Sequence, residues 1–333
     1  MTRSKHFPAF KAALPAMGAK TVAITGTTSG TGKVAAHTMA ELGAKVLVLN
    51  RSSDRSTTAL DELTATFPSA EVHSVECDLQ SFDSVTAAAA QVTELCPEGV
   101  DVLTNNAGVM ALGDVATVDG YDVQMQTNHL SHFLLTRQLM PRLQLAADER
   151  GEARVVNHSS VARMTPSRLL QSMYLEANGG DLGGDGNPVE NMMFSGPRWE
   201  RYNQSKLANA AFTAALHHRL QEADSDVKAL VAHPGLANTH LQKTSVREGG
   251  MGSLFTNIFM RLSQSPEDGA MGLISAMSLA DAESGRFYGP GSGAMAIRGK
   301  AIPFALEPYY DNEATRELLW SKSEEATGGP FTI

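Results

Sequence analysis

Cysteine is scarce in this chain of 333 residues, which contains only Cys77 and Cys96. A disulfide framework needs more cysteines, so we expect a reducing compartment and a cytoplasmic location. Long hydrophobic runs are also lacking, because no stretch approaches the ~18 uncharged apolar residues that would cross a membrane. No group of His, Cys, Asp and Glu has zinc-site spacing. The sequence therefore predicts a soluble protein with no transmembrane segment and no metal.

An excess of positive charge is missing as well. The 27 basic residues are outnumbered by 36 acidic ones, which gives a formal net charge of −9. Proteins that bind nucleic acids carry a basic patch or stripe that meets the phosphates. We therefore expect no nucleic-acid partner.

Short apolar runs alternate with helical stretches along most of the chain. The runs are apolar on both faces, which is typical of central parallel strands. This alternation predicts an α/β fold of the Rossmann type, a doubly wound parallel sheet of about seven strands in the order 3-2-1-4-5-6-7 with helices on both faces. Strands are predicted at 21–25, 45–49, 72–76, 100–105, 154–157 and 227–232, and helices at 34–42, 81–95, 121–145, 202–220 and 312–321.

No linker divides this series, so residues 20–333 are predicted to form a single domain after an N-terminal arm at 1–19. Two segments interrupt the alternation. One is an inserted loop at 162–198, rich in Gly, Asn, Met and Ser, and the other, at 238–265, is polar at first and then apolar. Long irregular segments in a compact domain are usually functional or mobile. We expect both to wall a substrate pocket, the second as a lid.

A glycine-rich turn, T-G-T-T-S-G-T-G, follows the first predicted strand. Gly26 allows a tight turn, Gly30 lets the backbone approach a pyrophosphate, and Gly32 lets the next helix pack closely on the sheet. N–H groups at the helix start would face the phosphates. The pattern favours a dinucleotide site over a tight turn without a ligand. The predicted contacts in this turn are Gly26, Thr28, Ser29, Gly30, Thr31 and Gly32.

The spacing T-G-x-x-x-G-x-G resembles that of the short-chain dehydrogenase/reductase family, and six further marks of this family follow in the right order over residues 20–241. They are an acidic residue after the third strand, an N-N-A-G turn, an Asn on the next long helix, a Ser pair, Y-x-x-x-K, and P-G followed by Thr. Residues 205–209, 286–290 and 314–321 are similar to its retinol-dehydrogenase-like branch. The marks stand at Asp78-Leu79, Asn105-Asn106-Ala107-Gly108, Asn128, Ser159-Ser160, Tyr202 with Lys206, and Pro234-Gly235 with Thr239.

Reduction of a carbonyl requires a hydride on carbon, which a nicotinamide supplies, and a proton on oxygen. Tyr202 and Lys206 share a helix face, and the Lys206 ammonium would lower the tyrosine pKa from ~10 so that Tyr202 can exchange protons. A serine hydroxyl would stabilise charge on the substrate oxygen. The resemblance assigns this task to Ser160, with the adjacent Ser159 as the rival. It also implies that Asn128 holds a water that relays protons to Lys206.

The end of the second predicted strand bears on the choice of cofactor. NAD enzymes place Asp or Glu there for the ribose 2′-hydroxyl, whereas this chain has Asn50-Arg51-Ser52-Ser53. A guanidinium suits a 2′-phosphate, so we predict NADP(H), although Asp54 lies nearby and Arg51 could be an exposed loop charge. By resemblance, Asp78 faces the adenine and Asn106 braces the cofactor. The other predicted cofactor contacts are Asn50, Leu79, Ala107, Gly108, Tyr202, Lys206, Pro234, Gly235 and Thr239.

The resemblance implies an oxidoreductase that interconverts a carbonyl and an alcohol. Methionine and phenylalanine in the two interrupting segments favour a hydrophobic alcohol, aldehyde or ketone. Packing of these segments on the core would explain the same residues equally well. Two alternatives stay open: a ring double-bond reductase of the protochlorophyllide-reductase type, whose reactive cysteine has no evident counterpart here, and a catalytically silent nucleotide sensor. Relatives associate through the helices that carry Asn128 and Tyr202, which suggests a homodimer or homotetramer.

Overall fold

A computed structural model describes residues 4–164, 168–192, 194–236, 263–291 and 297–333. Its centre is an eight-stranded sheet in the order β3-β2-β1-β4-β5-β6-β7-β8, in which every neighbouring pair is parallel except β7 with β8. The strands are β1 (Thr21–Thr25), β2 (Lys45–Asn50), β3 (Val72–Glu76), β4 (Val102–Asn105), β5 (Ala153–His158), β6 (Val227–Ala232), β7 (Arg286–Pro290) and β8 (Ala301–Ala305). The predicted Rossmann-type fold and its strand order are thus confirmed.

Strand burial explains the apolar runs in the sequence. Every residue of β4 and β5 is buried, because helices cover both faces of the sheet. The eighth strand was not predicted. It pairs antiparallel with β7 at the sheet edge and is partly exposed. An edge strand tolerates Pro303, which cannot donate to a second neighbour.

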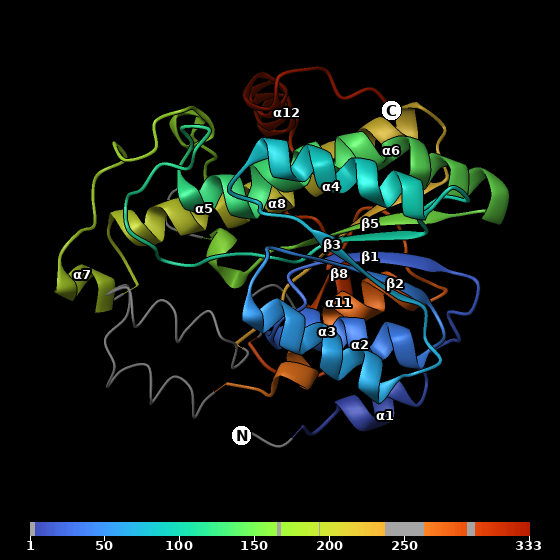
Figure 1. Cartoon of the computed structure of the whole chain (residues 1–333). Coiled ribbons are helices and arrows are strands. Elements are labelled where there is room, and N and C mark those ends of the chain that lie inside the picture. Colours follow the sequence, from blue (N-terminus) through green and yellow to red (C-terminus); the bar gives the residue numbers. More distant parts are fainter. Residues whose placement is uncertain (1–3, 165–167, 193, 237–262, 292–296) are drawn as a thin grey trace.

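The helices form layers on the two faces of the sheet (Figure 1). One layer contains α2 (Gly30–Glu41), α3 (Asp54–Thr66) and α11 (Pro266–Ser278), and the other contains α4 (Phe82–Leu95), α6 (Ser131–Arg150) and α8 (Pro197–Glu222). The short α1 (Phe7–Lys11) contacts α11, and α12 (Glu313–Thr327) packs on α8 and α6 as an outer layer. Helices α3 and α11 had no counterpart among the predicted elements. None of the described helices is long and apolar enough to span a bilayer.

The C-terminal helix occupies part of the surface that relatives were expected to use for association. Trp320 of α12 is buried, and its ring centroid lies 5.2 Å from that of Phe133 on α6. Phe331 lies 5.3 Å from the same ring. Part of this surface is therefore covered by the chain's own C-terminal segment.

The insertion at 162–198 contains two 3₁₀ turns, η2 (Val161–Met164) and η3 (Ser172–Leu175), and the short helix α7 (Pro188–Met192). Buried ionic groups anchor it. The fully buried guanidinium of Arg201 donates to the carbonyls of Leu182 and Gly184 and lies 3.3 Å from the carboxylate of Asp122 and 3.7 Å from that of Asp114. Asp114 in turn accepts hydrogen bonds from the N–H groups of Leu182 and Gly184. These contacts tie the insertion to α8.

We expect Arg201→Met to lower the free energy of unfolding by about 3–5 kcal/mol, because Asp122 would stay buried without its cation. Chemical denaturation measures this loss. The matched control is Arg286→Met, which removes an exposed pair with Glu283 and should cost less than about 1 kcal/mol. Equal losses in the two variants would contradict the anchoring role.

Candidate functional site

A cleft of about 550 Å³ opens over the carboxyl ends of β1, β4, β5 and β6. The chain leaves β1 towards β2 on one side and returns at β4 on the other, and ligands bind at such a reversal of strand order. Gly32 and Asn128 do not line the cleft, and Thr239 lies outside the described residues. The predicted residues that do line it are Gly26, Thr28, Ser29, Gly30, Thr31, Asn50, Arg51, Asp78, Leu79, Asn106, Ala107, Gly108, Ser160, Tyr202, Lys206, Pro234 and Gly235.

The glycine-rich turn presents the start of α2 to the cleft. Ser29, which precedes the helix, makes no side-chain cap, whereas the serines at the start of α3 and α4, Ser53 and Ser81, do cap their helices. The first N–H groups of a helix have no partner within the helix, so this end can receive an anion. A Cβ on Gly32 would come within 2.3 Å of Asn106 Nδ2. Gly32 therefore allows a close approach to Asn106, in addition to the helix–sheet packing expected.

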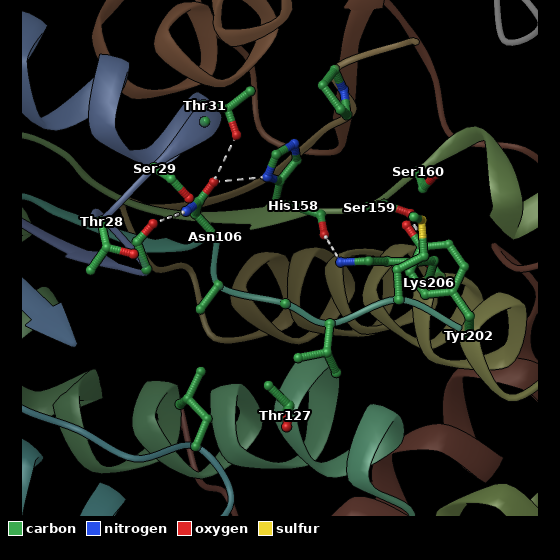
Figure 2. Close-up of a pocket in the computed structure, with 18 of the residues that line it drawn as sticks. Thr28, Ser29, Thr31, Asn106, Thr127, His158, Ser159, Ser160, Tyr202 and Lys206 are labelled. Carbon is green, nitrogen blue, oxygen red and sulfur yellow. Dashed lines mark hydrogen bonds between the residues drawn. The ribbon is translucent and has the colours of Figure 1, made fainter. Parts of the chain in front are cut away.

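Asn106 connects three of the loops that form the cleft (Figure 2). Its Nδ2 donates to the carbonyls of Thr25 and Gly26, and its Oδ1 accepts from Thr31 Oγ1 at 3.2 Å. The same Oδ1 lies 2.9 Å from His158 Nδ1. Because Oδ1 can only accept, His158 Nδ1 carries the proton in this network. Asn106 thereby fixes the turn after β1 against β4 and β5.

His158 was not among the predicted site residues, although it lines the cleft. Burial lowers its pKa to about 3, so the imidazole is neutral. Its backbone carbonyl accepts hydrogen bonds from Lys206 Nζ at 3.1 Å and from Asn209 Nδ2 at 3.0 Å. The residue thus connects the end of β5 to α8.

Two arginines stand at the end of the cleft beside β2. Arg51 and Arg55 are exposed and line it, and neither forms an ion pair with another described residue. Arg55 was not among the cofactor contacts predicted from the sequence. The only signal for it was its position in the first helical turn after Ser53. Asp54 does not line the cleft. Asn50 shapes the neighbouring turn by accepting from Thr27 N and donating to Thr27 Oγ1.

The opposite end of the cleft brings Ser160, Tyr202 and Lys206 together (Figure 2). The hydroxyl of Ser159 donates to the Lys206 carbonyl at 2.7 Å, whereas Ser160 is hydrogen bonded to the Tyr202 side chain. The two adjacent serines therefore have different partners, and Ser160 is the one that the structure pairs with the Tyr202 side chain.

Burial sets the proton affinities of this group. It raises the pKa of Tyr202 to about 12, and the hydrogen bond from Ser160 opposes this rise. It lowers the pKa of Lys206 to about 8. We expected Lys206 to lower the Tyr202 pKa, but in the protein alone burial and Ser160 are the groups that set this pKa, and the net effect is a rise.

Asn128 lies on a π-helical turn, η1 (Gln126–Leu130), between α5 (Val123–Met125) and α6. The helix predicted at 121–145 is thus interrupted, as often happens at functional sites. The Asn128 side chain accepts from Val109 N at 2.8 Å and donates to Val109 O at 3.0 Å and to Ser205 Oγ at 2.8 Å. It braces the loop after β4 against α8.

Apolar rings wall the cleft next to Tyr202. Trp199 lies one helical turn before Tyr202, with ring centroids 5.9 Å apart, and Phe194 of the insertion lies edge-on to Trp199 at 4.9 Å. Both line the cleft together with Met110. The insertion therefore contributes to the pocket wall, whereas the expected lid at 238–265 lies almost entirely outside the described residues.

Neither cysteine has the properties of a reactive group. Cys77 and Cys96 are buried, and burial raises their pKa values to about 12 and about 11. A thiol is nucleophilic only as a thiolate, so both are inert near neutral pH. Among the described residues no group of three His, Cys, Asp or Glu could hold a metal ion.

Comparisons with known proteins place this arrangement among its relatives. A family model described as short chain dehydrogenase matches residues 20–175. The chain is 32% identical to retinol dehydrogenase 13 from Homo sapiens, over 96% of this chain and 86% of that protein. It is 33% identical to the short-chain dehydrogenase TIC 32 A, chloroplastic, from Brassica napus, over 70% of this chain and 67% of that protein.

Solved structures show the same fold. The crystal structure of an uncharacterized protein from Mycobacterium Paratuberculosis matches with a TM-score of 0.72 and 30% identity over 100% of both chains. A 3-ketoacyl-(acyl-carrier-protein) reductase from Brucella melitensis, complexed with NADH, matches with a TM-score of 0.60 and 20% identity, over 84% of this chain and 100% of that chain. At that identity the second likeness extends to the fold alone.

Proposed function

Because the chain belongs to the short-chain dehydrogenase/reductase family, we propose that it is an NADP(H)-dependent oxidoreductase that interconverts a carbonyl and an alcohol on a hydrophobic small molecule. One observation carries this proposal. Ser160, Tyr202 and Lys206 meet at the apolar end of a cleft whose other end holds Arg51 and Arg55.

Tyr202 is the proposed proton donor to the carbonyl oxygen. A hydroxyl with a pKa of about 12 is fully protonated near neutral pH, as a general acid must be. Ser160 can donate to the same oxygen and stabilise the charge that develops there. When bound, the nicotinamide cofactor supplies the hydride. After proton transfer, the Lys206 ammonium stabilises the tyrosinate.

The cleft fits a dinucleotide along its length. The uncapped start of α2 is suited to the pyrophosphate, and Asp78 with Leu79 lines the wall proposed for the adenine. Asn50 stands where NAD enzymes have a carboxylate. The guanidinium groups of Arg51 and Arg55, which pair with no acidic side chain in the described part of the chain, are suited to a 2′-phosphate, which favours NADP(H).

The two buried cysteines support carbonyl reduction over the ring double-bond alternative, which relies on a reactive cysteine. The assay that tests the function follows NADPH and NADH consumption with a panel of hydrophobic aldehydes and ketones. Turnover with NADPH supports the proposal, whereas NADPH binding without turnover would favour the nucleotide sensor. Turnover that depends on light would favour the ring double-bond reductase.

We expect Arg51→Ala to weaken NADPH binding about 10- to 100-fold, because a charge-assisted hydrogen bond contributes about 1.5–3 kcal/mol. NADH lacks the 2′-phosphate, so its dissociation constant should change by less than about twofold. Fluorescence titration measures both constants. Arg286→Ala, which removes a guanidinium from the first residue of β7, is the matched control. Equal weakening of both cofactors by Arg51→Ala would remove the basis for NADP(H) preference.

A further inference from the structure

A fully buried arginine is hydrogen bonded to the backbone carbonyl of Ser160. Arg163 stands on the 3₁₀ turn η2, three residues after Ser160, and its side chain is 0% exposed. Burying a guanidinium is costly unless it is paired and hydrogen bonded. The carbonyl reduction proposed above assigns no role to the Arg163 side chain. The residues that it contacts therefore indicate its role.

The guanidinium of Arg163 holds the backbone of Ser160. Its Nη1 donates to the Ser160 carbonyl at 3.0 Å, and the Arg163 backbone N–H donates to the same oxygen at 3.2 Å. The Ser160 hydroxyl itself accepts from the Ala162 N–H at 3.2 Å. The orientation of the serine hydroxyl is therefore set by a turn that Arg163 closes.

Arg163 is in turn held by the C-terminal part of the chain. Both Nε and Nη2 lie 2.8 Å from Glu307 Oε2, and the guanidinium stacks over the Phe287 ring of β7 at 4.2 Å. Tyr309 donates its hydroxyl to the same carboxylate oxygen at 3.3 Å. Glu307 follows β8, far outside residues 20–175 that match the family model.

The same charge lies beside a second loop of the cleft. Arg163 is one of the groups that lower the pKa of His233, after burial. His233 Nδ1 accepts from Gly235 N at 3.1 Å and so shapes the turn that brings Pro234 and Gly235 to the cleft. Arg163 therefore holds the Ser160 turn and also acts electrostatically on the residue that shapes the Pro234 turn.

We propose that Arg163 and Glu307 are positioning residues that hold the Ser160 hydroxyl against Tyr202, so that the segment after β8 belongs to the catalytic apparatus. This rests on the proposed carbonyl reduction. Neither residue touches the reacting atoms. Both act through Ser160, so their effect on turnover should depend on the Ser160 hydroxyl. A purely structural role would show no such dependence.

The test is a double-mutant cycle of Glu307→Gln with Ser160→Ala. Removing a donor to the developing charge lowers kcat by about 10²–10³-fold, which is the expected effect of Ser160→Ala. Glu307→Gln should lower kcat about tenfold in the wild-type background but by less than about twofold in Ser160→Ala. In the second background the Ser160 hydroxyl is already absent, so Glu307 can no longer affect kcat by positioning it. The NADPH dissociation constant should stay within about twofold. Glu307→Asp, which keeps the charge, should retain more activity than Glu307→Gln.

Asp311→Asn is the matched control, since Asp311 pairs with His218 and Arg316 in the same segment. A second readout needs no turnover: amide hydrogen exchange at Ala162 and Arg163 should be faster in Glu307→Gln than in wild type and unchanged in Asp311→Asn. Equal losses of kcat with and without the Ser160 hydroxyl, or unchanged exchange in Glu307→Gln, would overturn the proposal. If the wild-type protein reduces no carbonyl, the proposed function is wrong. The hydrogen-exchange measurement would still test whether Arg163 and Glu307 hold the Ser160 turn in place.

Discussion

Tyr202→Phe is expected to lower kcat for carbonyl reduction by about 10²–10⁴-fold, the range that a positioned general acid contributes. The tyrosine is nearly fully buried, and its pKa of about 12 keeps it protonated near neutral pH. Phenylalanine preserves the ring that packs on Trp199 and removes only the hydroxyl. The NADPH dissociation constant should therefore change little while kcat falls. Initial rates together with a cofactor titration measure the two effects separately.

The matched control for this substitution is Tyr121→Phe. Tyr121 also uses its hydroxyl, donating to the Ala326 carbonyl at 3.3 Å, but it does not line the cleft. Its loss should leave kcat within about twofold of wild type. A Tyr202→Phe enzyme that kept more than about a tenth of wild-type kcat would exclude Tyr202 as the proton donor.

Lys206→Met is expected to abolish turnover and, at pH 7, to stabilise the protein by about 2 kcal/mol. Burial lowers the lysine pKa from its usual 10.5 to about 8. A tenfold change in a proton equilibrium is about 1.4 kcal/mol, so keeping the ammonium charged in the fold costs about 3 kcal/mol. Losing its hydrogen bond to the His158 carbonyl offsets about 1 kcal/mol.

The pH dependence of this effect has a definite sign. Between about pH 8 and 10.5 the unfolded chain binds the lysine proton and the folded chain does not, so wild-type stability rises with pH across this window. The advantage of Lys206→Met should be full below pH 8 and shrink above it. Denaturation at pH 7 and pH 10 measures this, with Lys228→Met, which removes a partly exposed ion pair with Glu152, as control. If Lys206→Met were less stable than wild type at pH 7, burial of the Lys206 ammonium would not destabilise the folded protein.

The sequence predicted the parallel part of the sheet well because buried parallel strands are short apolar runs with clear boundaries. Strands β1, β3 and β6 match the predicted bounds. The antiparallel strand β8 was missed because an edge strand needs no continuous apolar pattern, and it includes Pro303. The interruption at Asn128 was also missed, since a π-helical turn has no signature in hydrophobic spacing.

The candidate site could be predicted in outline from motif order, because most of the motifs follow strands whose carboxyl ends face the same crevice, and Asn128 and Tyr202 lie on helices beside it. The roles of individual side chains depend on hydrogen bonds that only the fold reveals. Ser159 and Ser160 look alike in sequence, yet one binds a helix carbonyl and the other the Tyr202 side chain. Arg163 and Glu307 are separated by more than a hundred residues, so no local pattern could connect them.

The most direct test of the central claim is transfer of deuterium from NADPH labelled at the hydride position to a hydrophobic aldehyde or ketone. Wild-type protein should give an alcohol with one deuterium on the former carbonyl carbon, and Tyr202→Phe should give almost none in the same time. Bound NADPH that transfers no deuterium to any carbonyl, while the fold and the cofactor affinity are intact, would contradict the assignment of this protein as a carbonyl reductase.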